Sequence, residues 1–228
     1  MKRSQVNAAI RRMEAMIAAC GFALPPFCGW TAEAWADKGH EYDEIRDNML
    51  GWDVTDYGEG DFAHMGFSLI TLRNGNCKQK DRYPKPYAEK LLYLDESQYA
   101  PMHFHWGKME DIVNRGGGNA LIRVYNATAD EAGFAPSDVQ ICGDGRRYTA
   151  PAGTQICLCP GESISIYPRV YHDFTVEKGT GPVLLGEVSM CNDDENDNRF
   201  YKPLGRFSTI EEDEAPYRLL CNEYPKAK

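Results

Sequence analysis

Apolar residues near the start of the chain recur at the spacing of an amphipathic helix. Between residues 6 and 17 they follow one another at intervals of three or four, so they lie on one face of a helix, and Ser4 is its expected N-cap. Thr31 is the expected cap of a short second helix, and a third is expected over Asp43–Met49. We therefore predict that residues 1–60 form a helical lead-in packed on the rest of the chain.

From Phe62 onward the pattern changes to that of β-strands. Short runs of β-branched and aromatic residues are separated by Gly, Pro, Asn and Asp, as in strands joined by turns. The expected strands are Phe67–Arg73, Glu89–Leu94, Met102–Trp106, Glu110–Asn114, Ala120–Tyr125, Gln155–Leu158, Ser163–Tyr167, Tyr171–Val176 and Val183–Cys191. Many short strands without helices between them favour an antiparallel sandwich or barrel. We predict an all-β dominated fold in which residues 61–228 form a barrel with a polar C-terminal tail, the whole chain being one domain.

Composition and charge narrow the range of partners. The 228 residues carry a formal net charge of −9 with a pI near 5.1, and an acidic surface repels nucleic-acid phosphates and anionic lipids. We therefore expect no nucleic-acid partner and no membrane association, which leaves a neutral small molecule as a possible ligand. The N-terminal sequence lacks the apolar core of a signal peptide, and no apolar run reaches the length of a membrane span. The eight cysteines include no C-x-x-C pair, and we expect free thiols in a reducing cytoplasm.

The middle of the chain carries a pattern typical of metal sites. His103 and His105 lie on the same face of an extended strand, because successive side chains alternate. A hairpin turn at Gly107 would fold Glu110 back beside these two imidazoles. His172, which shares a strand face with Phe174 and Val176 on a later strand, is the expected fourth ligand. Three imidazoles and one carboxylate suit a divalent metal of the Mn, Fe, Co, Ni or Zn group in a catalytic site, and we expect Mn²⁺.

A histidine pair, a following glutamate, a glycine-rich turn and a later histidine resemble the two metal-binding motifs of the cupin superfamily. The second motif departs from the cupin pattern, because Pro168 precedes His172 with no glycine between them. Across nearly its whole length the sequence is also similar to the cytoplasmic D-lyxose isomerases. The stretches that carry this similarity are His40–Trp52, Tyr87–Tyr93, His103–Gly118, Gly186–Met190 and Asp197–Phe200.

This resemblance implies a single cupin barrel, also called a double-stranded β-helix or jelly roll, with N-terminal helices. It implies a metal-dependent, usually Mn²⁺-dependent, aldose–ketose isomerase that interconverts D-lyxose and D-xylulose and often D-mannose and D-fructose. It also implies a homodimer, and it assigns metal binding to His103, His105, Glu110 and His172. In such a reaction a proton moves between C1 and C2 through an enediol stabilised by the metal, while one base serves both carbons.

Two residues are candidates for the proton transfer and for binding the reacting oxygens. Glu187 shares a strand face with Leu185 and Ser189, so we expect it to point into the barrel, where burial would raise its pKa toward the working pH of a base. A buried glutamate paired with a cation for structural reasons is the alternative. Lys90 is expected to point inward and to donate to a sugar oxygen; an outward lysine on an edge strand is the alternative. We count Glu110 among the catalytic residues as well as among the ligands.

Further residues are expected to bind the sugar. Asp194, Glu195 and Arg199 lie in a loop that could close over the substrate, and Trp106 has a flat face that could pack on a sugar. A solvated acidic loop and a core aromatic residue are the simpler alternatives. Two other functions stay open at this point. One is a metal-dependent cupin oxygenase that uses the same ligands for Fe(II), and the other is a non-catalytic sugar-binding cupin.

Overall fold

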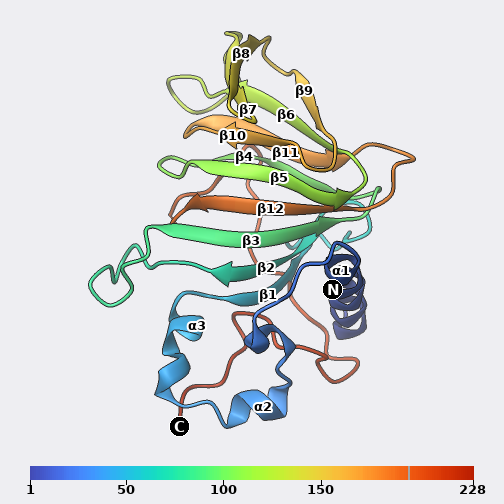
Figure 1. Cartoon of the computed structure of the whole chain (residues 1–228), viewed down its shortest axis with the longest axis vertical. Helices are drawn as coiled ribbons and strands as arrows, with labels where there is room; N and C mark the ends of the chain where they lie inside the picture. The colour runs from blue at the N-terminus through green and yellow to red at the C-terminus, as the bar shows by residue number, and fades with distance from the viewer. Residues whose placement is uncertain (195) are drawn as a thin grey trace.

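Thirteen strands form two antiparallel sheets in the computed structural model, which describes residues 1–194 and 196–228 (Figure 1). The order in the larger sheet is β1 (Gly51–Thr55), β2 (Phe67–Arg73), β3 (Tyr87–Leu94), β12 (Val183–Met190), β5 (Glu110–Gly117), β10 (Ser163–Ile166), β7 (Val139–Gly143) and β8 (Arg146–Ala150). The order in the smaller sheet is β13 (Arg199–Phe200), β4 (Tyr99–Phe104), β11 (Val170–Val176), β6 (Ala120–Asn126) and β9 (Gln155–Leu158).

The central strands of the two sheets have the order of a jelly roll. Strands β3-β12-β5-β10 of the larger sheet share one buried apolar core with β4-β11-β6-β9 of the smaller sheet. The chain changes sheet at each step from β3 to β6 and again from β9 to β12. This is the double-sheet arrangement of cupins, so the predicted fold class is confirmed.

The expected hairpin between the histidine pair and Glu110 is wrong. Strand β4 pairs with β11 and β13, whereas β5 pairs with β10 and β12. Residues 105–109 therefore cross from the smaller sheet to the larger one. Glu110 still faces the histidines, because the inward sides of the two sheets meet inside the barrel.

Four strands lie outside the sequence prediction: β1, β7, β8 and β13. Strand β1 lies within the segment predicted to be helical and pairs with β2 at the edge of the larger sheet. Strands β7 and β8 form a hairpin, and its turn residues Asp144 and Gly145 have φ values of 50° and 80°. A type I′ turn requires positive φ at both central residues, so this Asp-Gly pair was an available turn signal.

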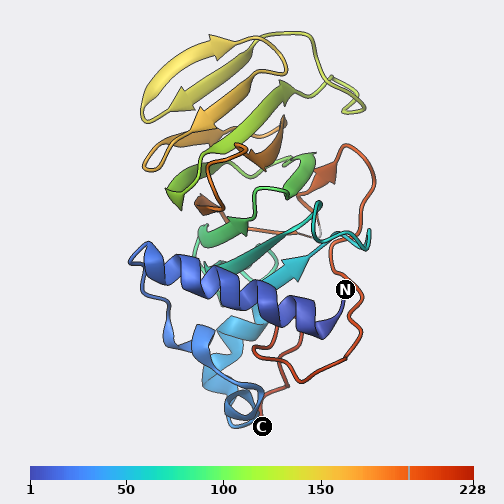
Figure 2. The same cartoon turned by 90° about the vertical axis from the view of Figure 1, so that its right-hand side faces the viewer.

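Helix α1 (Arg3–Ala19) lies across the outer face of the larger sheet (Figure 2). Its apolar face packs in a buried cluster with side chains of β1, β2, β3 and β12, which confirms the prediction from periodicity. Ser4 is not the N-cap, because the helix begins before it. Lys2 holds that position, and its backbone N–H donates to Gln5 Oε1 at 2.9 Å.

Short helical elements follow α1 and lie beyond the β1 edge of the larger sheet (Figure 1). They are η1 (Pro26–Gly29), α2 (Ala32–Ala36), η2 (His40–Tyr42) and α3 (Asp43–Asp47). Thr31 caps α2 as predicted, since its Oγ1 accepts a hydrogen bond from the Ala34 N–H at 3.2 Å. Helix α3 occupies most of the predicted third helical segment.

The C-terminal segment packs against β1 and is more than a polar tail. Leu220 and Cys221 are buried, and the Cys221 N–H donates to the Trp52 carbonyl oxygen at 2.8 Å. Arg206 reaches Asp53 on β1, with 2.5 Å between Nη1 and Oδ2. These contacts join residues far apart in the sequence, so the local composition of the segment does not reveal them.

The structure also bears on the state of the cysteines and on the expected absence of a membrane span. All eight cysteines are free thiols, as predicted. Among the described residues, no helix combines the length and the apolar character needed to cross a membrane.

Candidate metal centre and active site

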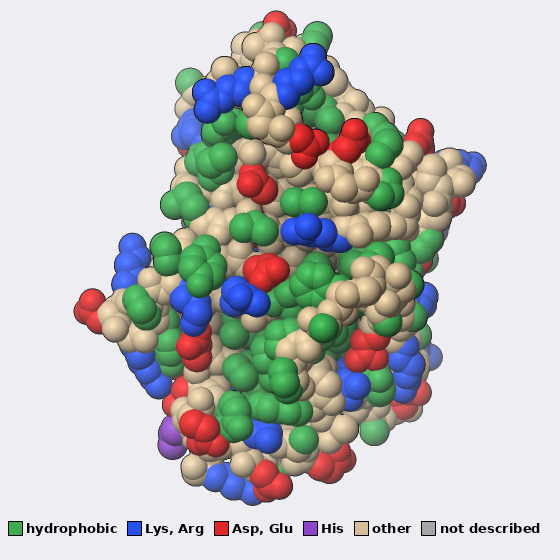
Figure 3. All heavy atoms as spheres, in the orientation of Figure 1, with side chains coloured by type: hydrophobic (Ala, Val, Ile, Leu, Met, Phe, Trp, Pro, Cys, Tyr) green, Lys and Arg blue, Asp and Glu red, His purple; other side chains and the backbone are tan. Residues whose placement is uncertain are grey.

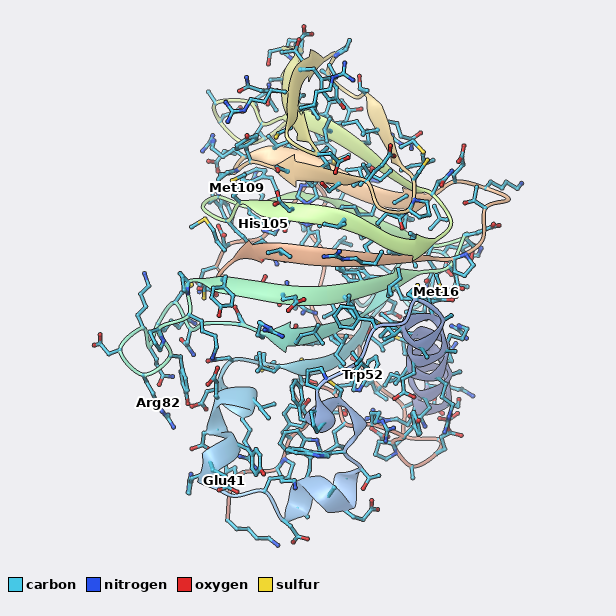
Figure 4. The ribbon with its side chains drawn as sticks, viewed as in Figure 1. Met16, Glu41, Trp52, Arg82, His105 and Met109 are labelled. Carbon is cyan, nitrogen blue, oxygen red and sulfur yellow. The ribbon has the colours of Figure 1, made fainter. Side chains whose placement is uncertain are left out.

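Three histidines meet at one end of the barrel interior. His103 on β4 pairs directly with His172 on β11, and His105 follows the end of β4. The ring centroid of His103 lies 4.2 Å from that of His172 and 5.1 Å from that of His105. One ligand nitrogen of each histidine lies within 4.8 Å of the other two. In Figure 4, His105 and Met109 mark this end of the barrel, where the chain crosses from β4 to β5.

Backbone carbonyl groups fix which ring nitrogen carries the proton. In His103 and His172, Nδ1 lies 2.8 and 3.0 Å from the carbonyl oxygen two residues earlier, and in His105 it lies 2.7 Å from the Asp197 carbonyl oxygen. Because a carbonyl only accepts, each Nδ1 donates and each Nε2 presents a lone pair. The Nε2 atoms of His105 and His172 are buried and receive no hydrogen bond from the described part of the chain. Such orientation by a second hydrogen bond is typical of metal-binding histidines.

Burial also keeps two of these imidazoles neutral. It lowers the pKa of His103 well below the ordinary value, and the neighbouring His172 and His105 lower it further. Burial likewise lowers the pKa of His105, and the positive charge of Lys108 acts in the same direction. Neutral imidazole is the form that binds a metal.

Glu110 brings a carboxylate to the same cluster. Its Oε1 lies 3.0 Å from His172 Nε2, and its Oε2 lies 3.4 Å from His105 Nε2. Burial alone would raise the pKa of Glu110, but the positive charge of Lys108, together with the interaction with His105, holds it well below the ordinary value. The fold therefore brings together the four residues that the sequence proposes as ligands.

A buried network of charges continues from Glu110 along the cavity wall. Lys108 Nζ lies 2.7 Å from Glu110 Oε2 and 2.9 Å from Glu187 Oε1. Lys90 Nζ lies 3.2 Å from the same Glu187 oxygen and donates to Asn192 Oδ1 at 2.8 Å. None of the four charged side chains is more than 8 % exposed. The inward orientation predicted for Glu187 and Lys90 agrees with this geometry.

The expected rise in the pKa of Glu187 is wrong in direction. Burial acts to raise this pKa, but the ammonium groups of Lys108 and Lys90 outweigh burial, and the pKa lies below the ordinary value. The Ser189 hydroxyl also donates to Glu187 Oε1 at 3.0 Å. Pairing with a cation, the alternative interpretation of a buried Glu187, describes the contacts that the structure shows. The group is thus an ionised carboxylate at neutral pH, able to accept a proton.

Lys108 is a site residue that sequence reasoning missed. It lies in the 105–109 connection, where strand alternation gives no direction for a side chain. Its position between the histidine pair and Glu110 was the available signal, because a cation inside a ligand motif is expected to pair with the carboxylate.

Asp197 is the second missed residue, and it holds the 105–109 connection in place. Its carboxylate accepts the Gly107 N–H at 2.8 Å and the Lys108 N–H at 2.9 Å. Its backbone carbonyl accepts the Nδ1–H of His105. One residue thus orients a histidine of the three-histidine cluster and the turn that carries Lys108. A contact made through a backbone carbonyl leaves no signature in the sequence.

The other residues predicted to bind the sugar lie in two different places, one inside the inner cavity and one outside it. Asp194 lines the inner cavity beside Lys90 and Glu187. Trp106 and Arg199 are absent from the described lining of that cavity. The Trp106 Nε1–H donates to Glu131 Oε2 at 2.9 Å, and the Arg199 Nε–H donates to the Glu131 carbonyl oxygen at 2.8 Å. Both side chains thus hold the loop that carries Glu131, and their predicted sugar binding gains no support from this position.

Glu195, the remaining member of the loop expected to close over the sugar, lies outside the described residues. Its neighbour Asp194 is fixed by Arg206, with 2.8 Å between Nη2 and Oδ2. The Asn198 amide also donates to Asp194 Oδ1 at 3.3 Å. The described part of this loop is therefore tied to the cavity wall by charged and amide groups.

The donor set fits a divalent metal ion. Buried Nε2 lone pairs without a protein donor converge beside a carboxylate, and the cluster contains no thiolate. Imidazole and carboxylate ligands without cysteine are typical of catalytic centres of the Mn to Zn series rather than of structural zinc.

The fold and the site together define a cupin-type barrel enzyme with a buried, histidine-rich centre able to hold a metal. A family model described as D-lyxose isomerase matches residues 1–224. The chain is 48 % identical over 225 residues to a D-lyxose/D-mannose isomerase of Serratia proteamaculans and 45 % identical to one of Escherichia coli O157:H7, with 98 % of both chains covered in each case. The chain belongs to the D-lyxose isomerase family and is an aldose–ketose isomerase.

Solved structures with the same fold include sugar isomerases of low sequence identity. The ligand-free L-ribose isomerase of Cellulomonas parahominis has a TM-score of 0.59 at 14 % identity, with 92 % of this chain and 98 % of that chain covered. The L-ribose isomerase of Acinetobacter sp. DL28, in complex with L-ribose, has a TM-score of 0.58 at 12 % identity and the same coverage. At these identities the similarity concerns the fold alone.

Proposed function

We propose that this isomerase interconverts D-lyxose and D-xylulose, and also D-mannose and D-fructose, with a divalent metal as cofactor. The observation that carries the proposal is the convergence of three histidines and Glu110 within reach of the buried Glu187. The curated relatives, both named D-lyxose/D-mannose isomerase, support the choice of sugars. His103, His105, Glu110 and His172 would hold the metal, and Mn²⁺ is our first choice.

Aldose–ketose isomerisation requires a proton to leave one carbon and to return to its neighbour. Glu187 is the proposed base, because its ionised carboxylate lies inside the cavity and a single group can serve both C1 and C2. The bound metal would supply positive charge that polarises the sugar carbonyl. Lys108 and Lys90, both within 3.2 Å of Glu187 Oε1, would donate hydrogen bonds to sugar oxygens as negative charge develops there.

A panel of sugars tests this proposal. The protein is stripped with a chelator, reloaded with Mn²⁺, incubated without oxygen with free pentoses and hexoses, and assayed for ketose. We expect D-xylulose from D-lyxose and D-fructose from D-mannose in the loaded protein, and little product in the stripped protein. The absence of ketose from every sugar, or equal activity without metal, would contradict the proposal.

The same panel separates the two alternative functions. A cupin oxygenase would need O₂ for turnover, and family membership already favours isomerisation. A binding protein would keep its sugar affinity and have no turnover to lose. For an isomerase, Glu187→Gln should abolish ketose formation while sugar binding, measured by calorimetry, stays within a few-fold of the original.

We also propose a homodimer in the cytoplasm. Support for the dimer comes from exposed apolar residues on paired strands of the larger sheet: Tyr87 on β3, and Val188 and Met190 on β12. Figure 3 shows hydrophobic side chains gathered on the side of the molecule formed by this sheet. Analytical ultracentrifugation tests the dimer, and Met190→Lys should shift the equilibrium to monomer.

Support for a location in the cytoplasm comes from the eight free cysteines, because thiols stay reduced in that compartment.

A further inference from the structure

Two neighbouring cavities share one wall. The inner cavity, of about 60 Å³, is lined by His103, His105 and Glu110 of the proposed metal site, by Glu187 and by the two lysines. The second cavity, of about 380 Å³, is lined in part by amide and carboxylate side chains of residues 47–53, 74–76 and 192–194. Leu69, Asp194 and Arg206 line both cavities.

An ion triad forms the polar part of this wall. Arg206 lies between two carboxylates, with 2.8 Å from Nη2 to Asp194 Oδ2 and 2.5 Å from Nη1 to Asp53 Oδ2. The Asp53 side chain is 2 % exposed, whereas Arg206 and Asp194 are each about a quarter exposed. Asp53 therefore anchors the guanidinium, and the Asp194–Arg206 pair presents polar atoms to the cavities.

The triad ends a row of alternating charges that begins at the metal cluster. The row runs from Glu110 through Lys108, Glu187, Lys90, Asp194 and Arg206 to Asp53. Much of the remaining inner lining is apolar, with Phe67, Leu92 and Phe174 among its members. The hydroxyl groups of a sugar need polar partners in a pocket. The Asp194–Arg206 wall can provide such partners for hydroxyl groups that lie away from the reacting carbons.

Size gives a second reason to involve the wall. The inner cavity of about 60 Å³ is small beside the neighbouring cavity of about 380 Å³. A sugar that is longer at its remote end would therefore gain room if the Asp194–Arg206 wall between the two cavities were opened.

We propose that the Asp194–Arg206 pair, anchored by Asp53, receives the end of the sugar remote from C1 and C2 and determines the chain length that fits. The proposal rests on the proposed function and names the residues that give it selectivity. D-Mannose differs from D-lyxose by one further carbon and its hydroxyl at this remote end. The closed ion pair favours the pentose, whereas removal of the guanidinium joins the two cavities and gives the longer sugar room.

The test is the ratio of kcat/KM for D-mannose to kcat/KM for D-lyxose. In Arg206→Met we expect this ratio to rise about tenfold, the effect of one carbon in a fitted pocket. Asp53→Asn keeps the arginine but weakens its anchor, and the ratio should move less in the same direction. If Arg206→Met fails to fold, Asp53→Asn decides the question.

Arg3→Met is the matched control. Arg3 is also buried between two carboxylates, Glu212 and Glu223, but it lies on α1, away from both cavities. Its loss should destabilise the protein without changing the ratio. A ratio within about twofold of the original in both wall variants, or an equal change in Arg3→Met, would overturn the proposal.

Binding of the two alditols, obtained by reducing D-lyxose and D-mannose, provides a readout without turnover. Their affinities, measured by calorimetry, should shift in favour of the longer alditol in Arg206→Met. If the metal-loaded protein turned over neither sugar, the proposed function would fail, but the alditol affinities would still decide whether the wall selects by length. Unchanged relative affinities would overturn the wall proposal alone.

Discussion

The two ends of the barrel interior differ sharply although the same strands build them. On each of four strands the inward-facing position changes from a charged or imidazole side chain to an apolar one within two residues. These changes are Lys90 to Leu92 on β3, Glu110 to Ile112 on β5, Glu187 to Leu185 on β12 and His172 to Phe174 on β11. One end of the barrel is thus a hydrophobic core, and the other is a buried polar network.

The two ends contribute differently to the stability of the fold and to the chemistry of the site. Burial of apolar side chains stabilises the fold directly, whereas burial of charged groups is costly unless each finds a partner. At the polar end, Lys108 pairs with both Glu110 and Glu187, and Lys90 also pairs with Glu187. We infer that the apolar end maintains the barrel so that the polar end can keep charged groups where a sugar needs them.

Lys108→Met should produce the largest loss of stability, because it breaks the ion pairs at the polar end. Glu110 and Glu187 would lose their shared cation, and removing one partner of a buried ion pair costs about 3–5 kcal/mol of stability. We also expect isomerase activity to fall on the order of 100-fold. Denaturant unfolding and steady-state kinetics measure the two effects.

The control for this variant is Lys85→Met, which removes a partly exposed ion pair with Glu44. An exposed pair contributes only about 0–1 kcal/mol. Equal losses of stability in the two lysine variants would mean that the buried network has no special role.

Ile122→Ala, at the apolar end of the barrel, should lower stability and leave catalysis almost unchanged. Ile122 on β6 is fully buried in the apolar cluster and does not line either site cavity. Its truncation should cost about 2–5 kcal/mol of stability while kcat/KM, measured well below the unfolding temperature, changes little. A large loss of kcat/KM with an intact fold would contradict the separation of the two ends.

Acid should destabilise the metal-free protein through its polar end. His103 and His105 have lowered pKa values in the folded chain, so the unfolded chain takes up protons first as the pH falls below about 6.5. Stability should therefore decrease with falling pH below that point, by up to about 2.7 kcal/mol per pH unit for two imidazoles.

Urea unfolding between pH 7 and 5, with a chelator present, measures this slope. The double variant His103→Gln, His105→Gln should lose most of it, whereas Ile122→Ala should lower the whole curve without changing its slope. An unchanged slope in the double variant would show that these histidines are not buried as neutral imidazoles.

Asp197→Ala should give the smallest effect, and it tests how the polar end is positioned. The variant keeps the carbonyl that binds His105 but removes the carboxylate that holds the Gly107 and Lys108 N–H groups. We expect metal affinity to fall about 10- to 100-fold, measured by competition with a chelator. Asp193→Ala, a change in the same loop, is the control and should leave the affinity unchanged.

Much of the polar end could be predicted because it follows from local rules. Alternation along β12 and β3 indicated that Glu187 and Lys90 point inward, and the spacing of His103 and His105 indicated a shared face. His172 followed from the same alternation on a later strand. These inferences need only the geometry of a single strand.

The missed residues depend on contacts that a single strand does not contain. Lys108 lies in a connection between sheets, and Asp197 acts partly through its backbone carbonyl. Arg206 and Asp53 belong to segments expected to be a tail and a helical lead-in, and they meet only when the C-terminal segment packs along β1. The pKa of Glu187 was misjudged because the expectation of a raised value relied on burial, whereas Lys108 and Lys90 both pair with its carboxylate and lower the pKa.

The most direct test of the account is the metal content and activity of His172→Ala beside the original protein. We predict that the original protein binds about one divalent ion per chain and forms D-xylulose from D-lyxose. The variant should remain folded by circular dichroism, lose most of its metal and form no ketose. An undiminished metal-to-protein ratio in the folded variant, or undiminished ketose formation, would contradict a metal centre built on these histidines.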